Sequence, residues 1–245
     1  MHRFYAAEET ASAGARVTLP AEDARHAAQV LRLRAGDEAE IFAGGARYLA
    51  RAEEISAQRA AFTLLERLPD TEPGLWVTLF QGLPKGDKLE TVIQKSVELG
   101  VKEIVPVTFS RCVARLDARD AARKLERWRK IAREACKQSG RAFFPEVGMP
   151  VTVRELCGKL GGFDAAAVPW EEARGRGLTA FHAAHPAARR LAVVIGPEGG
   201  IDPGEIDALR AAGCEPVTLG PRILRTETAP IAALAALMTL YGEME

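Results

Sequence analysis

The sequence predicts an α/β protein in which a mainly parallel sheet, covered by helices, follows a small β-barrel. Two observations favour this fold class. From residue 75 onward, short apolar runs alternate with segments of helical periodicity, as parallel strands joined by helices do. Before residue 69, short β-type runs follow one another with glycine turns between them, which is typical of a barrel. Residues 69–74 are rich in turn formers, so we expect domains at 1–72 and 73–245.

The first domain is expected to contain β-type segments at 16–20, 39–44, 48–56 and 59–68. One helix interrupts them, at about 21–33. The dipeptides Gly36-Asp37 and Gly44-Gly45 are the turn signals between strands.

The second domain is expected to contain strands at 75–83, 101–109, 163–170, 191–197 and 214–221. Its first helix should begin at Asp87, with Glu90 as capping-box partner, and end at Gly100. Further helices are expected over 118–139, from Asp202 to Gly213, and in the apolar segment after Pro230.

Composition favours an intracellular protein. The four cysteines, Cys112, Cys136, Cys157 and Cys214, form no CxxC pair, so free thiols in a reducing cytoplasm are expected. No apolar run reaches the length of a membrane span, and no membrane association is expected. His182 and His185 form an HxxH without nearby ligands, so we expect no metal.

The segment 191–209, LAVVIGPEGGIDPGEIDAL, predicts a buried strand, a tight glycine turn and a capped helix. It lacks the GK[ST] of a Walker phosphate loop and the G-x-G-x-x-G of the usual dinucleotide turn. Gly196, Gly199 and Gly200 would allow a ligand to approach the backbone closely. A sharp turn without a ligand is the alternative reading of the same residues.

A second glycine loop, LGPRILRTETAP at 219–230, also lies between a strand and a helix. Two such strand ends in one sheet can form two walls of one pocket. Arg222, Arg225 and Glu227 would be ordinary in a solvated loop. The apolar pair Ile223-Leu224 beside them instead favours a cavity with one dry and one polar wall.

IGPEGG at 195–200, followed by LGPRILRTETA, closely resembles the bacterial 16S ribosomal RNA (uracil-N3)-methyltransferase family of the SPOUT superfamily. Four further segments match in order: residues 26–42, 85–101, the Arg111-Cys112 pair and 127–141. The resemblance implies a PUA-like barrel, a domain with a trefoil knot, and a homodimer. It also implies S-adenosylmethionine as methyl donor and 16S rRNA of the small subunit as partner.

The resemblance places the cofactor between the two loops. One wall would consist of Gly196, Pro197, Gly199 and Gly200, and the other of Leu219, Gly220, Ile223, Leu224 and Arg225. Trp170 either borders this pocket or belongs to the core. Alanines 229, 232, 233, 235 and 236 of the last helix offer a surface for dimer packing.

Methylation at uracil N3 requires loss of a weakly acidic proton, which a base or a cation near the carbonyl oxygens would assist. Glu198 and Glu227 are the carboxylates of the two motifs, and Arg222 and Arg225 are the cations. The sequence does not assign the base, because either glutamate could instead cap a helix.

N3 lies on the Watson–Crick edge, so the target base must be unpaired or extruded. The segment 111–141 has eleven basic and four acidic residues, which favours phosphate binding over a merely solvated helix face. The expected RNA contacts are Arg32, Arg34, Arg111, Arg123, Arg127, Lys130 and Arg141. Two other functions stay open here, another SPOUT methyltransferase target and a non-catalytic RNA-binding or ribosome-assembly factor.

Overall fold

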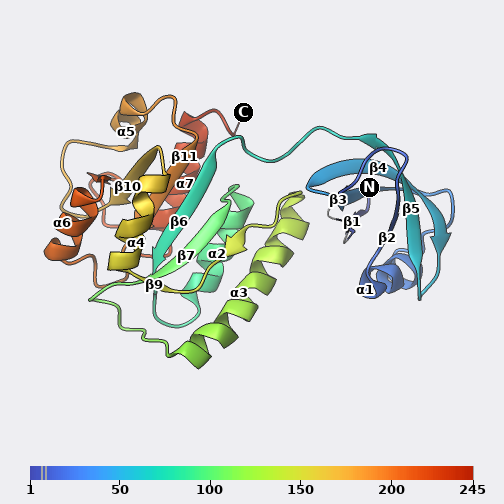
Figure 1. The fold of residues 1–245 in the computed structure, drawn as a ribbon, viewed down its shortest axis with the longest axis horizontal. Coiled ribbons are helices and arrows are strands. Elements are labelled where there is room, and N and C mark those ends of the chain that lie inside the picture. Colours follow the sequence, from blue (N-terminus) through green and yellow to red (C-terminus); the bar gives the residue numbers. More distant parts are fainter. Residues whose placement is uncertain (7, 9, 245) are drawn as a thin grey trace. The chain divides into compact units, whose positions relative to one another are not determined.

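The computed structural model describes residues 1–6, 8 and 10–244. The chain divides into two compact units, coloured along the sequence in Figure 1. The smaller unit contains Met1–Glu72 together with Cys136–Phe143, and the larger contains Pro73–Ala135 and Phe144–Glu245. Residues 136–143, which the sequence-based division places in the second domain, thus pack with the first unit.

The smaller unit is built on a sheet with the strand order β1-β3-β4-β5-β2. Its pairs are antiparallel, except that β1 runs parallel to β3. Gly44 and Gly45 have φ values of 57° and 70° and form the tight turn from β3 to β4, as the sequence predicts. The strands are β1 (Arg3–Tyr5), β2 (Arg16–Thr18), β3 (Glu38–Ala43), β4 (Ala46–Ile55) and β5 (Ala60–Arg67).

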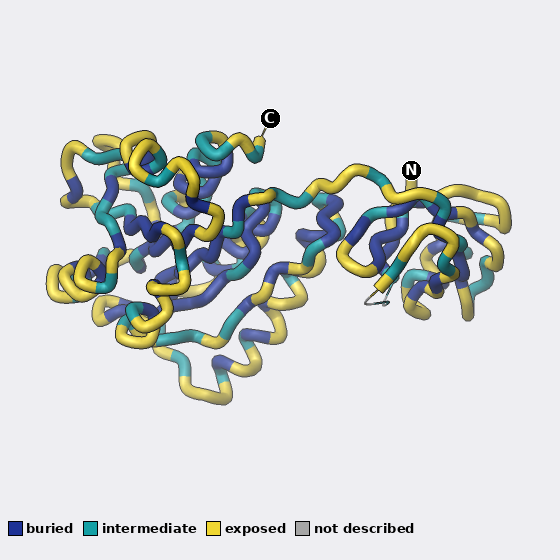
Figure 2. Tube along the Cα trace, turned by 45° about the horizontal axis from the view of Figure 1, so that its top comes forward, coloured by how far each residue is buried: buried dark blue, intermediate teal, exposed yellow. Residues whose placement is uncertain are grey.

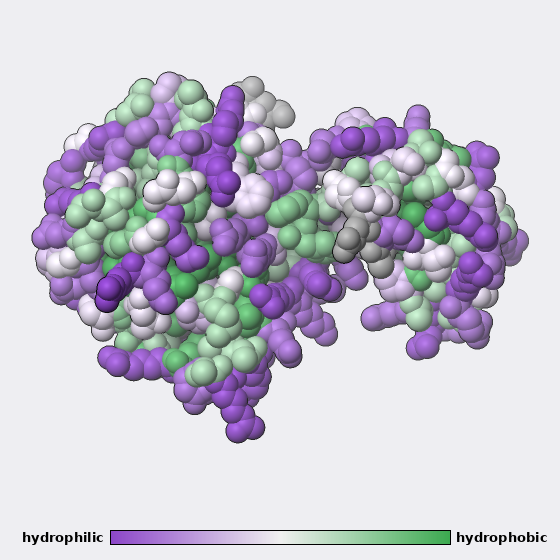
Figure 3. Space-filling model, in the orientation of Figure 1, coloured by the Kyte–Doolittle hydropathy of each residue, from purple (hydrophilic) through white to green (hydrophobic). Residues whose placement is uncertain are grey.

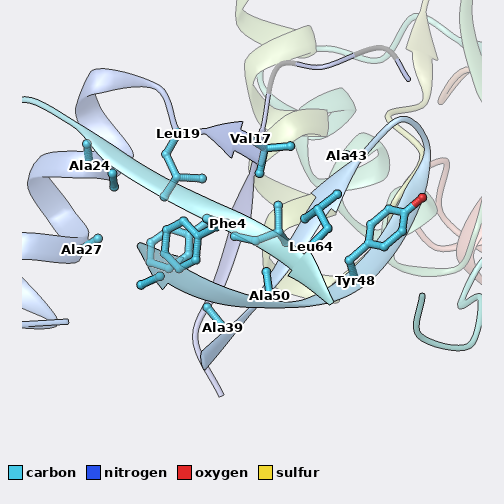
Figure 4. Close-up of a cluster of buried hydrophobic side chains, with 14 of the residues drawn as sticks. Phe4, Val17, Leu19, Ala24, Ala27, Ala39, Ala43, Tyr48, Ala50 and Leu64 are labelled. Atoms are coloured by element: carbon cyan, nitrogen blue, oxygen red, sulfur yellow. The ribbon is translucent and has the colours of Figure 1, made fainter. Parts of the chain in front are cut away.

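The core of this sheet arises from alternation along its strands. Tyr48, Ala50 and Ala52 of β4 point inward and pack with Phe4 and Leu64, as Figure 4 shows for most of them. Helix α1 (Ala21–Arg25) covers this core and continues as a π-helical turn, His26–Val30.

The returning segment Cys136–Phe143 is fixed to the smaller unit by polar contacts. The Tyr5 hydroxyl donates to the carbonyls of Cys136 and Arg141 at 3.0 and 2.8 Å. Arg141 is 4% exposed, and its guanidinium donates to Glu72, with the shortest N–O distance 2.7 Å. This pair is a buried charge cluster of the smaller unit.

The larger unit contains the expected parallel sheet, with strand order β12-β10-β11-β6-β7-β8 and with β9 beside β7. Its central strands are buried along most of their length (Figure 2). The strands are β6 (Trp76–Gly82), β7 (Glu103–Thr108), β8 (Glu146–Val147), β9 (Val151–Thr152), β10 (Ala165–Pro169), β11 (Arg190–Ile195) and β12 (Cys214–Val217).

Helices pack on this sheet, with α7 against α2, α5 and β11, and α4 against α6 and β7. The helices after the linker are α2 (Lys88–Glu98), α3 (Ala118–Ser139), α4 (Val153–Lys159), α5 (Leu178–Ala184), α6 (Pro203–Ala211) and α7 (Ala229–Leu240). The last residues of α3, from Cys136 on, belong to the smaller unit. A 3₁₀ turn, Leu160–Gly162, follows α4.

Three helices differ from the sequence prediction, since α4 and α5 were not expected and α2 lacks its expected cap. The expected capping box at Asp87 is wrong, because its side chain makes no cap hydrogen bond and Glu90 pairs with Arg127 at 2.6 Å. Asp202 does cap α6, together with Glu205. Helix α4 was not expected, although it begins with a capping box formed by Thr152 and Glu155.

Candidate functional site

Parallel strands β10, β11 and β12 end at the same edge of the larger unit's sheet, and the segments that follow them line one cavity of about 1130 Å³. Ligands of open α/β sheets bind at this edge. Lys88 and Ala229 also line the cavity, and the rest of its wall comes from Pro169–Trp170–Glu171, Ala173–Arg174–Gly175, Ile195, Gly196, Pro197, Glu198, Gly199, Gly200, Ile201, Thr218, Leu219, Gly220, Pro221, Arg222, Ile223, Leu224, Arg225 and Thr226. The structure therefore brings the two glycine loops together.

Backbone conformation and close contacts explain why glycine occupies two positions of these loops. Gly200 has a φ of 72°, and a Cβ there would overlap the carboxylate of Glu171. Gly220 has a φ of 101° with open space where its Cβ would be. Only glycine adopts such backbone angles readily, so the two loops bring bare backbone to the cavity.

A buried hydrogen-bond chain joins the loops to the central strand. The Thr226 hydroxyl donates to the Gly196 carbonyl at 2.8 Å and accepts from Gln81 Nε2 at 3.0 Å. Thr226 is 6% exposed and Gln81, at the end of β6, is fully buried. Sequence reasoning missed both residues, and the only local signal was the polar Gln81 near the end of a largely apolar strand.

The charged candidates fall into two groups. Arg222 and Arg225 line the cavity and, within the described part of the chain, have no carboxylate in ion-pair reach. Glu198 and Glu227 both face Lys88, whose Nζ lies 3.1 Å from Glu198 Oε1 and 3.4 Å from Glu227 Oε2. Lys88 was missed by sequence reasoning because it lies 110 positions from Glu198.

In the part of the chain that the structure describes, neither Glu198 nor Glu227 caps the helix that follows it. The N-cap of α7 is Thr228, without a side-chain cap bond, and Asp202 caps α6. Burial alone would raise the pKa of Glu198, but hydrogen bonds from its own amide, from Lys88 and from the Lys85 amide outweigh burial and lower this pKa. Glu198 is therefore held in its ionised form.

Trp170 lines the cavity, and the Arg210 guanidinium stacks on its ring at 5.4 Å. Beside α7 lies a shallower groove of about 570 Å³, in which Ala232, Ala235 and Ala236 meet Leu178 and Leu219. Leu219 thus lines both the groove and the cavity.

The expected RNA contacts of the larger unit lie on its surface. Arg123, Arg127 and Lys130 are exposed on α3, where Figure 3 shows hydrophilic side chains. Arg111 lies next to the cavity, 3.2 Å from Asp202 and near the Gly199 carbonyl.

In the smaller unit, Arg32 and Arg34 are exposed, and Arg32 has a φ of 56°. The interpretation of Arg141 as an RNA contact needs correction, because its guanidinium is 4% exposed and bound to Glu72. A charge run in a sequence does not distinguish a surface arginine from one in a buried pair.

The two histidines have protein partners. His185 Nε2 lies 2.6 Å from Glu215 Oε1, and His182 packs edge-on against the Tyr241 ring. Among the described residues, no three His, Cys, Asp or Glu side chains gather as a metal site would require. Within the same residues, no helix is long and apolar enough to span a membrane.

Comparison with known proteins agrees with this organisation. Residues 71–238 match the model of an RNA methyltransferase domain, and residues 19–65 match that of an RNA methyltransferase PUA domain. Ribosomal RNA small subunit methyltransferase E of Bacillus subtilis is 37% identical over 227 residues, which are 90% of this chain and 88% of the relative.

Solved structures give the same result. A ribosomal RNA small subunit methyltransferase E of Neisseria gonorrhoeae bound to S-adenosyl methionine has a TM-score of 0.82, 37% identity and full coverage of both chains. A methyltransferase of Legionella pneumophila in complex with the same cofactor has a TM-score of 0.81 and 31% identity, over 97% of this chain and 96% of that one. The family resemblance seen in the sequence is confirmed: the chain belongs to the RNA methyltransferase family that includes ribosomal RNA small subunit methyltransferase E.

Proposed function

We propose that the protein transfers a methyl group from S-adenosylmethionine to N3 of a specific uridine in 16S rRNA of the small ribosomal subunit. The observation that carries the proposal is the single cavity lined by both glycine loops at the carboxyl edge of a parallel sheet. The cofactor in two similar structures and the name of the Bacillus relative support it.

The cavity suits the proposed methyl donor in size and in its walls. A volume of about 1130 Å³ is ample for a nucleoside with an amino-acid tail. We assign the donor's contacts to Gly196, Pro197, Gly199 and Gly200 on one side and to Leu219, Gly220, Ile223, Leu224 and Arg225 on the other, with Arg225 contributing its backbone and not its side chain. The donor's sulfonium supplies the activated methyl group.

The remaining chemistry falls to charged side chains. As N3 loses its proton, negative charge spreads onto the uracil carbonyl oxygens, and Arg222 and Arg225 are cations in the cavity wall without a carboxylate partner among the residues that the structure describes. Hydrogen-bond donors that are already in position before the reaction stabilise this developing charge without a cost of reorganisation. Glu198 and Glu227 are the candidates for the base.

Three features of the family are part of the proposal. The groove beside α7 presents small and apolar side chains of Ala232, Ala235 and Ala236, and we assign it to homodimer contact. The trefoil knot and a cytoplasmic location are expected for the same enzyme. We also propose that Arg32, Arg34, Arg111 and the exposed face of α3 contact the RNA.

The function is tested by nucleoside mass analysis of ribosomal RNA from cells with and without this protein. Loss of one N3-methyluridine, restored by the purified protein with S-adenosylmethionine, is the expected result. Loss of a different modified nucleoside would point to another target, and no change despite cofactor binding would point to a silent RNA-binding factor.

Gly220→Val should abolish cofactor binding while the fold survives. The branched side chain would occupy open space in the cavity wall, on a backbone with φ of 101°. Gly213→Val is the matched control, because Gly213 has a φ of 88° and equally open surroundings but does not line the cavity. Calorimetric titration with S-adenosylmethionine compares them, and equal affinities would remove Gly220 from the binding site.

Replacing Arg123, Arg127 and Lys130 together with glutamine should weaken RNA binding and flatten its salt dependence. Each lost phosphate contact lowers the slope of log affinity against log salt by about one. Arg123 and Arg127 also pair with Asp120 and Glu90, so a slope reduced by less than three is expected. An unchanged slope would mean that α3 is only a solvated surface.

A further inference from the structure

Three segments meet at Lys88, which is the first residue of α2. Glu198 reaches it from the loop after β11, and Glu227 reaches it from the loop before α7. The side chain of Lys88 is 37% exposed, and those of Glu198 and Glu227 are 31% and 25% exposed. Lys88 and Glu198 line the cavity that we assign to the methyl donor, and Glu227 lies next to its lining, directly after Thr226. One ammonium group therefore holds one carboxylate in the cavity wall and a second one beside it.

The carboxylates near Lys88 determine its protonation state. The carboxylates that face it are Glu198 and Glu227, and its hydrogen bond to Glu198 is the main reason that the pKa of Lys88 is raised. Two acidic residues that are close to Lys88 in the sequence interact with Arg127 instead. Glu90 forms an ion pair with Arg127, and the charge of Asp87 contributes to the raised pKa of the same arginine. Lys88 thus stays protonated and cannot itself serve as the base.

The two glutamates are not equivalent. Glu198 Oε1 accepts from both Lys88 Nζ and the Lys85 amide, each at 3.1 Å. With its lowered pKa, Glu198 is a weak proton acceptor. Glu227 Oε2 is buried and makes no hydrogen bond to the described residues; Lys88 holds it only by the ion pair at 3.4 Å. Glu227 is the carboxylate with capacity left for a proton.

We propose that Lys88 is a positioning residue that holds Glu227 beside the cavity as the acceptor of the uracil N3 proton, with Glu198 as its fixed counterpart. This inference rests on the proposed function. In the step, the N3–H bond breaks and the proton passes to the Glu227 carboxylate. The N3 electron pair forms the bond to the methyl carbon, while the carbon–sulfur bond breaks and its electron pair stays on sulfur.

Removing Lys88 takes away the ammonium group that the Glu198 and Glu227 carboxylates share. Like charges at one site raise the pKa of at least one carboxyl group, so the base loses its ionised form at a higher pH. For Lys88→Met we expect the acid limb of the rate–pH profile to move to higher pH. A purely structural role would instead lower the rate by one factor at every pH.

The experiment measures single-turnover methylation of ribosomal RNA at saturating cofactor, across pH, for the intact protein and its variants. Glu227→Gln should lose on the order of a hundredfold in rate, the contribution typical of a general base, and Glu198→Gln should lose clearly less. Lys88→Arg should restore the wild-type profile in large part. Lys95→Met is the matched control, since Lys95 lies on the same helix and pairs only with Glu98 there among the interactions described.

A second measurement needs no substrate. Carboxyl NMR titration should show the pKa of Glu198 rising in Lys88→Met relative to wild type, because Lys88 is one of the groups that lower it. A wild-type protein that transfers no methyl would overturn the proposed function. An active wild type with an unshifted Lys88→Met profile, or with a larger loss in Glu198→Gln than in Glu227→Gln, would overturn the positioning role alone.

Discussion

Arg225→Ala is expected to bind S-adenosylmethionine normally and to transfer methyl about a hundredfold more slowly or worse. Arg225 lines the cavity, and its backbone carbonyl accepts from the amides of Thr228 and Ala229 at 2.8 and 2.9 Å. Because those backbone bonds survive the substitution, the loop should keep its shape. The lost guanidinium is a donor for negative charge that develops only in the transition state, so the rate and not the affinity should fall.

Arg225→Lys separates charge from geometry. Lysine keeps the positive charge but lacks the planar fork of donors that fits a carbonyl oxygen in fixed orientation, so we expect little rescue. Single-turnover assays at saturating cofactor are the measurement, with Arg154→Ala, an exposed arginine on α4, as control. A near-normal rate for Arg225→Ala would leave Arg225 as a surface charge.

Arg141→Met should destabilise the smaller unit by about 3–5 kcal/mol, the cost typical of leaving one charge of a buried pair without its partner. Glu72 is 9% exposed in its side chain. One of its carboxylate oxygens also accepts from the Phe143 amide at 3.0 Å, but a neutral amide does not replace the positive charge of the lost guanidinium. Denaturant unfolding of the full chain, followed by a probe in the smaller unit, measures the loss.

Two companion variants show whether burial causes the effect. Arg51 and Glu38 form an ion pair in the same unit with side chains 56% and 43% exposed, and Arg51→Met should cost about 1 kcal/mol or less. The double replacement Arg141→Met with Glu72→Leu should recover much of the loss, because no buried charge is left. Equal effects of Arg141→Met and Arg51→Met would contradict the account.

The parallel sheet and the two glycine loops could be predicted because their signals are local. Gly200 and Gly220 follow buried strands directly, and backbone angles that favour glycine explain them. Lys88 could not be predicted, because its role depends on two residues that folding brings from distant loops. Arg141 was misjudged for the opposite reason: its neighbours in sequence are surface cations, but its partner Glu72 lies 69 positions away.

The shortest strands could not be predicted from the sequence for a different physical reason. Strands β1 and β8 have three and two residues, which is too short for a period of two to be visible. Their pairing is decided by the neighbouring strand, as in the parallel contact of β1 with β3. The tie between Thr226, Gly196 and Gln81 is likewise a tertiary contact without a local signature.

The smaller unit is assembled from two stretches of chain, Met1–Glu72 and Cys136–Phe143, and this affects its biosynthesis. While a ribosome makes the protein, Glu72 emerges well before Arg141, its buried partner. At a synthesis rate of roughly 5–20 residues per second, the wait lasts on the order of several seconds. During that interval the nascent smaller unit lacks its second stretch, Cys136–Phe143. The smaller unit can therefore be completed only after residue 143 has left the ribosome, and an arrested chain that ends at the linker should be more open to proteases than one that extends past residue 143.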